Sequence, residues 1–110
     1  MKGREATEDE QIYMSKVAQL SCIVCANQGK ENRRVEIHHV NGKTIENAHF
    51  DILPLCYEHH RQGNAEEPIS RHPYKKRFVT AYGAEEELIK QVRTKVEYQD
   101  FLEELDECPF

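Results

Sequence analysis

The sequence predicts an α+β fold in which a small core, built around a two-stranded antiparallel ribbon, is flanked by helices. Apolar residues recur at helical spacing from Ala84 to about Leu105, and residues 34 to 38 alternate as a strand does. Two short cysteine and histidine motifs lie thirty residues apart, between residues 22 and 59. Because only 38% of the 110 residues are hydrophobic, we expect one domain whose core needs more than hydrophobic burial to hold it together.

A helix is expected to open the chain. Thr7-Glu8-Asp9-Glu10 has the pattern of a capping box, in which the hydroxyl and the last carboxylate satisfy free N–H groups at the helix start. The apolar residues that follow, to about residue 20, are spaced as one face of a helix. They are Ile12, Val17 and Leu20, with Tyr13 and Met14 as further candidates for the buried face.

A turn, the ribbon and a short helix are expected next. Cys22 to Cys25 has the setting of a tight turn, and the strand at Arg34 to His38 precedes a turn at Asn41-Gly42. The apolar stretch from Phe50 to Leu55 contains Pro54, which has no N–H to donate between strands, so a strand end or a loop is expected there. A helix from Tyr57 to about Gln62, ended by Gly63, should follow.

Two further helices are expected after it. Pro68 and Pro73 bracket a helix start, with Ser70 as the expected cap, Pro73 in the first turn and Gly83 at the end. Its buried face should consist of Phe78, Val79 and Tyr82. The last helix, from Ala84 to about Leu105, should pack through Leu88, Ile89, Val92, Val96, Phe101, Leu102 and Leu105. The expected parts are thus a helix (1–21), a core (22–66) and C-terminal helices (67–110).

The charge is unevenly distributed along the chain. The formal net charge is −5, yet residues 22 to 83 hold nine Lys or Arg against seven Asp or Glu. The stretch from Arg61 to Arg77 is the most basic. A basic face suits a nucleic-acid partner, although the charge alone fits a solvated face without a partner equally well.

The cysteine motifs suit a structural zinc ion. Cys22-x-x-Cys25 and Cys56-x-x-His59 have the ligand types and local spacing of tetrahedral zinc. Buried thiols or a redox Cys-x-x-Cys pair are the alternatives, but a redox pair does not explain Cys56 and its histidine neighbours. Cys108 is a rival fourth ligand.

Two adjacent histidine pairs, His38-His39 and His59-His60, suggest a second site. Neighbouring side chains on a helix point about 100° apart, so His59 and His60 are expected to serve different sites. If His59 completes the zinc motif, His60 should face the strand end that bears His38 and His39. Such a cluster can bind a divalent metal through neutral rings and leave one ring as a base.

These motifs resemble a known family. Cys22-x-x-Cys25, Val35-Glu36-Ile37-His38-His39-Val40 and Asp51-x-x-Pro54-Leu55-Cys56-x-x-His59-His60-Arg61 are similar to the HNH, or ββα-metal, nuclease motif in its zinc-knuckle form. The run Leu55 to Arg61, with the later His72 and Tyr82-Gly83, resembles more closely the phage recombination enhancement function (Ref) nucleases. The resemblance covers about Cys22 to Val92. It implies a zinc-stabilised treble-clef core and a RecA-dependent DNA endonuclease.

The resemblance also implies roles for individual residues. His39 would be the general base, and His38 and His60 would bind the catalytic metal. Asp51 occupies the position at which the family's middle Asn orients the base by a hydrogen bond. This substitution leaves the role of Asp51 open, although a carboxylate can also hold the imidazole of His39. Either His72 or Asn64 would complete the second site, with His72 preferred.

The implied chemistry is phosphodiester hydrolysis with Mg²⁺ or Mn²⁺ as the working ion, although Zn²⁺ can occupy imidazole ligands. Arg61, Arg71, Lys75 and Lys76 would bind phosphates of DNA without reading its sequence. A RecA-type recombinase filament is the second expected partner. Neither the strand form of the substrate nor the oligomeric state follows from the sequence.

Two rival functions remain open. One is a non-catalytic zinc module that recognises DNA or protein, which predicts one metal site. The other is an accessory protein that docks a partner on an exposed apolar stripe of the last helix. We expect a cytoplasmic location, in a bacterial host cell if a phage encodes the chain, because the cysteines resemble metal ligands and no apolar run approaches the length of a membrane span.

Overall fold

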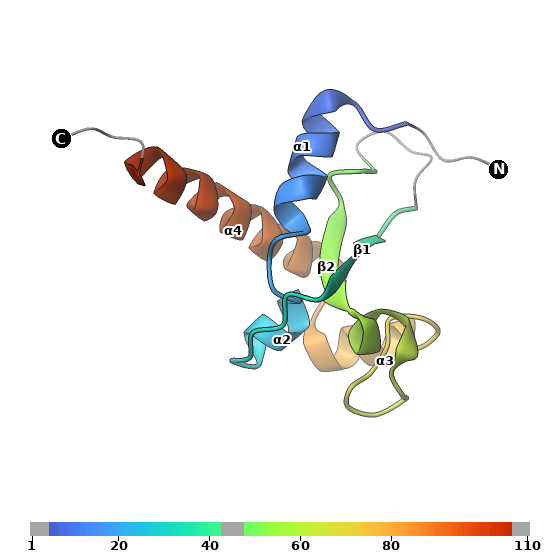
Figure 1. The fold of residues 1–110 in the computed structure, drawn as a ribbon. Coiled ribbons are helices and arrows are strands. Elements are labelled where there is room, and N and C mark those ends of the chain that lie inside the picture. Colours follow the sequence, from blue (N-terminus) through green and yellow to red (C-terminus); the bar gives the residue numbers. More distant parts are fainter. Residues whose placement is uncertain (1–4, 43–47, 107–110) are drawn as a thin grey trace.

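The computed structural model describes residues 5–42 and 48–106, and these form an α+β structure around a two-stranded sheet (Figure 1). Its elements are, in order, α1 (Glu8–Val17), α2 (Ile23–Asn27), β1 (Val35–His39), β2 (Ile52–Cys56), the π-helix η1 (Glu58–Gln62), α3 (Lys75–Tyr82) and α4 (Glu85–Asp106). The strands are antiparallel, with Val35 opposite Cys56 and His39 opposite Ile52.

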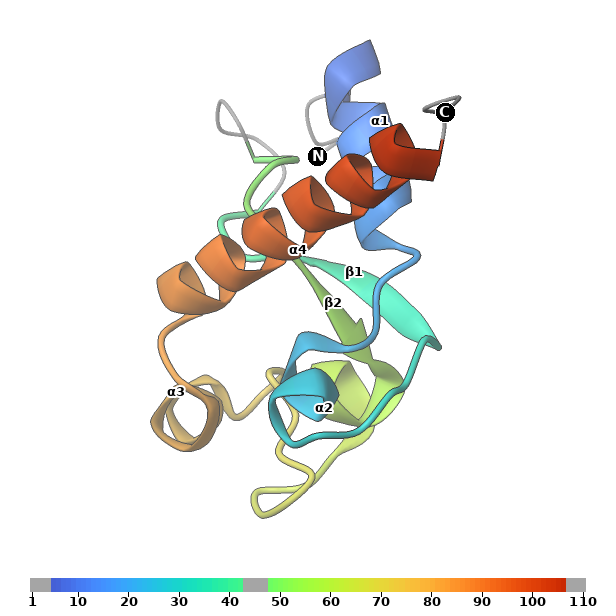
Figure 2. The same ribbon diagram turned by 90° about the vertical axis from the view of Figure 1, so that its left-hand side faces the viewer.

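Strand β2 is the centre of the packing. All five of its residues are buried, and α1, α2 and α4 contact it. Figure 2 shows α4 running across the ribbon, while α2 and α3 lie near the end at which β2 finishes. The cysteine motifs and η1 are therefore held at that end by the core. Among the described residues, no helix is long and apolar enough to cross a membrane.

Helix α1 begins as expected, but its buried face differs. The Thr7 hydroxyl accepts the N–H of Glu10 at 3.2 Å, and the Glu10 carboxylate accepts the N–H of Thr7 at 2.8 Å, which confirms the capping box. Val17 is buried in the core, and Tyr13 packs against it. Ile12 is 48% exposed, so its assignment to the buried face is wrong. The helix also ends at Val17 rather than near residue 20.

Two other local expectations require correction. The Cys22–Cys25 turn is the start of a short helix, α2, because the N–H of Ala26 reaches the carbonyl of Cys22 at 2.9 Å. Pro54 lies inside a regular strand opposite Ile37, not at a strand end. Each strand of a two-stranded sheet has one open edge, and a proline there gives up no ladder hydrogen bond.

Helix α3 ends at Gly83 as expected, with φ of 103°, a conformation that glycine adopts readily. Its start is different, because the residue preceding the helix is Tyr74, so Pro73 lies before the helix rather than in its first turn. Ser70 does not cap it. The Ser70 side chain is fully buried, and its hydroxyl has no hydrogen-bond partner among the described residues.

Helix α4 is confirmed, but only part of its apolar stripe packs. Leu88, Val92 and Val96 are at most 5% exposed, whereas Phe101 and Leu105 are 54% and 50% exposed. The C-terminal part of α4 extends past the ribbon (Figure 1), and within the described part of the chain Phe101 and Leu105 do not join the core. Burial of the first three residues removes the support for a docking stripe at that part of the helix. Cys108 lies outside the described residues.

Candidate metal centres

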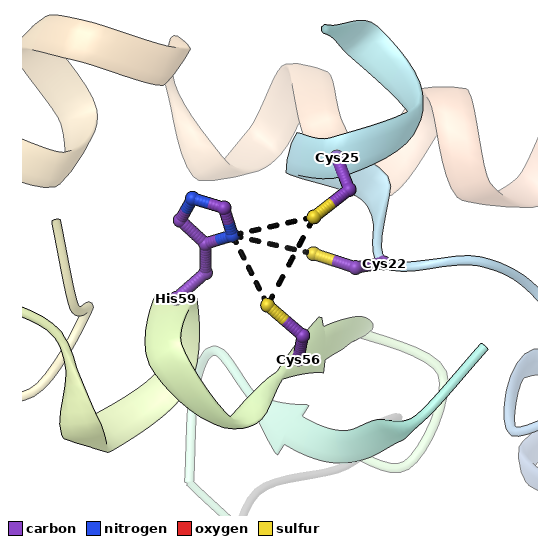
Figure 3. Close-up of side chains that lie close together, drawn as sticks. All are labelled: Cys22, Cys25, Cys56 and His59. Atoms are coloured by element: carbon purple, nitrogen blue, oxygen red, sulfur yellow. Dashed lines mark hydrogen bonds between the residues drawn. The ribbon is translucent and has the colours of Figure 1, made fainter. Parts of the chain in front are cut away.

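Three segments bring Cys22, Cys25, Cys56 and His59 together (Figure 3). Cys22 and Cys25 come from the start of α2, Cys56 ends β2 and His59 lies in η1. Nδ1 of His59 lies 3.7, 3.6 and 3.2 Å from the sulfur atoms of Cys22, Cys25 and Cys56. The sulfurs of Cys25 and Cys56 are 3.9 Å apart. All four side chains are buried.

The donor set suits a metal ion such as zinc. Tetrahedral zinc with bonds of about 2.3 Å to sulfur and about 2.0 Å to nitrogen places its ligand atoms about 3.5 to 3.8 Å apart. Three of the four measured separations lie near that range, and the fourth, between Cys56 and His59, is somewhat shorter. The group is closed, because its four buried side chains would occupy every position of a tetrahedron around an ion.

Burial and neighbouring groups shift the pKa values of the three thiols. Burial raises the pKa of Cys25, as does the neighbouring Cys22. Burial likewise raises the pKa of Cys56. Burial opposes ionisation of Cys22 too, but the interaction with His59 and the backbone N–H groups of Cys25 and Cys56 together outweigh it and lower the pKa of Cys22 to about 7. A cation at the centre would stabilise all three thiolates at once.

Glu67 fixes the orientation of the His59 ring. Its carboxylate lies 3.1 Å from Nε2 of His59, on the side of the ring away from the sulfurs. The same carboxylate accepts hydrogen bonds from the Tyr82 hydroxyl and the Gln28 amide. Carboxylates commonly hold the second nitrogen of a metal-binding histidine in this way. The contact therefore links α2, the loop after η1 and α3 to the closed site.

A second group consists of His38, His60 and His72. Each offers one ring nitrogen, and these nitrogens lie within 4.8 Å of one another. The ring centroids are 5.1 to 5.3 Å apart. His38 is buried, His60 is half-buried and His72 is exposed. This group is therefore open to solvent on the His72 side, unlike the closed cysteine group.

Two carboxylates hold two of these rings. Oε2 of Glu85 lies 3.1 Å from Nε2 of His38 and also accepts Nε of Arg71 at 2.9 Å. Oε1 of Glu36 lies 2.7 Å from Nδ1 of His60. Each ring therefore has one nitrogen engaged by a carboxylate and the other available to face an ion.

Electrostatics keep the exposed part of the second group uncharged. Burial lowers the pKa of His60, and the positive charge of a protonated His38 would lower it further, against the opposing effect of Glu36. Burial and the nearby His38 and Arg71 lower the pKa of His72. The neutral imidazole is the form that binds a metal, so these pKa values favour binding near neutral pH.

Backbone hydrogen bonds place His72 beside His60. The N–H groups of Arg71 and His72 donate to the carbonyls of His59 and His60, at 2.9 and 3.0 Å. These carbonyls belong to η1, so the loop satisfies part of the helix end. A Cβ on Gly63 would lie 2.4 Å from two carbonyl oxygens, and the loop can only close here around a glycine. The geometry thus favours His72, the preferred alternative to Asn64.

The expected base and its expected partner have other neighbours. Nε2 of His39 lies 3.0 Å from Nδ1 of His49, and the two rings meet edge to face. The carboxylate oxygens of Asp51 accept hydrogen bonds from Asn41 at 3.1 Å and Arg93 at 2.9 Å. Asp51 therefore ties the turn after β1 to α4.

The basic residues that were expected to bind phosphate differ in their exposure and in their hydrogen-bond partners. Lys75 and Lys76 are exposed in the first turn of α3. Arg61 is about half exposed, stacks on Tyr57 and makes two hydrogen bonds to Glu36. The Arg71 side chain is only 12% exposed and is paired with Glu85, which makes it a poor phosphate ligand. Its pairing neutralises a buried carboxylate instead.

Comparison with known proteins places the chain in a family. A sequence model of the family described as recombination enhancement, RecA-dependent nuclease matches residues 6–97. The chain belongs to this family. The description identifies its members as nucleases, and thus hydrolases, that act in recombination and depend on RecA. The resemblance to recombination enhancement nucleases, predicted from the motif around Cys56, is therefore confirmed at the family level.

Sequence reasoning missed the residues that contact the candidate ligands and the expected base. Glu36 shares a face of β1 with His38, a period-two signal that was present in the sequence. Glu67, Glu85 and His49 had no comparable signal. Their partners lie 8, 47 and 10 residues away, so the contacts depend on how separate segments pack.

Proposed function

We propose that this protein is a metal-dependent endonuclease of the HNH type that hydrolyses phosphodiester bonds of DNA held by a RecA-type filament. The observation that carries the proposal is the open His38, His60 and His72 group beside a closed cysteine group. The consecutive residues His59 and His60 belong to different groups, as a structural and a catalytic site require. The ribbon followed by η1 is consistent with a treble-clef, or ββα-metal, core.

Each group would have a separate task. Zinc in the Cys22, Cys25, Cys56 and His59 group would join α2, β2 and η1 and so stabilise the small core. The open group would take Mg²⁺ or Mn²⁺, with Zn²⁺ as a possible occupant. A divalent ion there supplies charge stabilisation to the phosphate in the transition state and to the leaving oxygen.

The remaining chemistry is assigned to side chains of the chain. His39, one residue after His38, would accept a proton from the attacking water. The water oxygen bonds to phosphorus, the bond from phosphorus to the leaving oxygen breaks, and that oxygen takes a proton from solvent. Lys75 and Lys76 would hold neighbouring phosphates, as would the half-exposed Arg61 through the N–H groups that Glu36 does not engage, which positions DNA without reading its sequence.

Metal content and cleavage together test the proposal. Elemental analysis of the folded protein should find two metal sites, and Mg²⁺ or Mn²⁺ should support DNA cleavage in the presence of a RecA filament. His39→Ala and His60→Ala should abolish cleavage while retaining the fold, whereas Lys90→Ala, on an exposed face of α4, should cleave normally. His39→Ala with full activity would remove the proposed base. One metal and no cleavage with the filament supplied would favour a zinc-binding recognition module.

A further inference from the structure

Tyr82, the last residue of α3, contacts the loop that joins η1 to α3 at two points. Its hydroxyl accepts the N–H of Ile69 at 3.0 Å and donates to the carboxylate of Glu67. A tyrosine hydroxyl can donate one hydrogen bond while it accepts another, so both contacts form at the same time. The proposed mechanism assigns no task to Tyr82.

We propose that Tyr82 is a positioning residue that holds this loop so that His72 reaches the open group. The inference deepens the proposed function and rests on it, because it concerns a ligand of the proposed catalytic metal. His72 lies three residues after Ile69 in the same loop. Its exposed ring contacts only the other two rings of the open group among the described residues, so the loop backbone must set its position before an ion binds.

The Tyr82 ring is held firmly enough to anchor the loop. It packs edge to face on Phe78, which is fully buried, with the ring centroids 5.0 Å apart. On another side it meets the ring of His59, with centroids 5.2 Å apart and planes at 85°. Aromatic pairs in this arrangement attract each other, so the two neighbours restrict the place of the hydroxyl. The anchor is therefore attached to the core and to the closed group.

The loop backbone carries this position on to His72. Ile69, whose N–H the Tyr82 hydroxyl accepts, is 9% exposed and packs in the hydrophobic core. Beyond it, the N–H of His72 donates to the carbonyl of His60 at 3.0 Å. Only two residues separate these two points of attachment. The segment therefore has little freedom to move away from η1 while both attachments are intact.

Glu67 connects the same hydroxyl to the closed group. Its carboxylate lies 3.1 Å from Nε2 of His59, whereas Nδ1 of that ring faces the sulfur atoms (Figure 3). The Glu67 side chain is 55% exposed, so hydrogen bonds hold it in place, and Tyr82 and Gln28 donate two of them. One hydroxyl thus supports ligands of both groups. A support that orders ligands before an ion arrives raises affinity, because less entropy is lost on binding.

The first test is hydrogen exchange in Tyr82→Phe, which removes the hydroxyl but keeps the packed ring. In the zinc-loaded protein the amide of His72 should exchange about 3- to 10-fold faster, the factor expected from one hydrogen bond, while the amide of Val92 in α4 should not change. Tyr98→Phe is the matched control, because Tyr98 is 60% exposed, and it should change neither rate. An unchanged rate at His72 in Tyr82→Phe, or an equal rise at Val92, would overturn the inference.

The second test uses metal affinity to separate positioning from a general loss of structure. Ni²⁺ binds imidazole more tightly than Mn²⁺ does, so its affinity for the open group stays measurable in variants that lack one ligand. In the zinc-loaded protein, Tyr82→Phe should weaken Ni²⁺ binding about 3- to 10-fold, with unchanged zinc content by elemental analysis. In a His72→Ala background the same substitution should have no further effect, because its effect depends on His72.

Two outcomes of this titration would overturn the inference. One is an unchanged Ni²⁺ affinity in Tyr82→Phe, and the other is an equal loss of affinity with and without His72. Failure of the proposed function is recognised separately, as a wild-type protein that binds the ion at the open group but does not cleave DNA when a RecA filament is supplied. Neither the exchange rates nor the Ni²⁺ affinities depend on cleavage.

Discussion

Replacing Glu85 tests the link between the open histidine group and the protein core. The Glu85 side chain is 6% exposed, and one of its oxygens serves both His38 and Arg71. Glu85→Ala would leave the guanidinium of Arg71, itself 12% exposed, without its carboxylate. It would also release Nε2 of His38 and so free that ring to rotate.

The size of the effect follows from burial. Removing one partner of a buried ion pair costs about 3 to 5 kcal/mol, and the partial exposure of Arg71 places the expected loss near the lower end. For a small domain with a total stability of about 5 to 15 kcal/mol, this is a large fraction. Loss of the partner of a metal-binding histidine should also weaken binding at the open group about 10- to 100-fold.

Urea denaturation of the zinc-loaded protein measures the free energy of unfolding, and Mn²⁺ titration measures affinity at the open group. Glu86→Ala is the matched control, because Glu86 lies in the same first turn of α4 but is exposed. It should change stability by less than about 0.5 kcal/mol. Glu85→Gln keeps the size of the side chain and one acceptor oxygen, so its free energy of unfolding should lie between those of Glu85→Ala and Glu86→Ala. A loss below about 1 kcal/mol in Glu85→Ala, with unchanged Mn²⁺ affinity, would refute the reasoning.

Three further predictions concern the two groups and their supports. Cys56→Ala should unfold the protein in circular dichroism as a chelator does, because structural zinc contributes about 10 to 16 kcal/mol; a normal melting curve would contradict this. Gly63→Ala should lower stability by about 1 to 3 kcal/mol in urea denaturation, because its Cβ would meet backbone oxygens at 2.4 Å; an unchanged denaturation midpoint would contradict this. Hydrogen bonds from Arg61 and His60 lower the pKa of Glu36 to about 2, so its stabilising contacts should persist above pH 4.5 and disappear as pH falls toward 2; carboxyl carbon-13 shifts should show that titration, and a midpoint near 4.5 would exclude the contacts.

Local patterns predicted much of the fold because their physics is local. The capping box at Thr7 depends on residues three positions apart, and the helix α4 on a repeat of 3.6 residues. The predictions were wrong where the outcome depended on residues that are distant in the sequence. Ile12 has the spacing of a core residue but is 48% exposed among the described residues, and Pro54 suits a strand only because that strand has an open edge.

The sequence by itself identified most of the candidate ligands, although it left open whether His72 or Asn64 belongs to the second group. Cys-x-x-Cys and Cys-x-x-His place their donors close together through local backbone geometry, and the adjacency of His59 and His60 separates the two groups whatever the rest of the chain does. These assignments need only the identity and the spacing of the residues.

Only the tertiary structure decided which groups support those ligands. Glu85 meets His38 across 47 residues, and Glu36 meets His60 across 24. Arg71 donates a hydrogen bond to the buried carboxylate of Glu85, so it is not available to phosphate. His39 contacts His49, and Asp51 accepts a hydrogen bond from Arg93 on α4. Such choices follow from the packing of separate elements, since a charged or polar group that is buried must find its partner among whatever side chains the fold brings within reach.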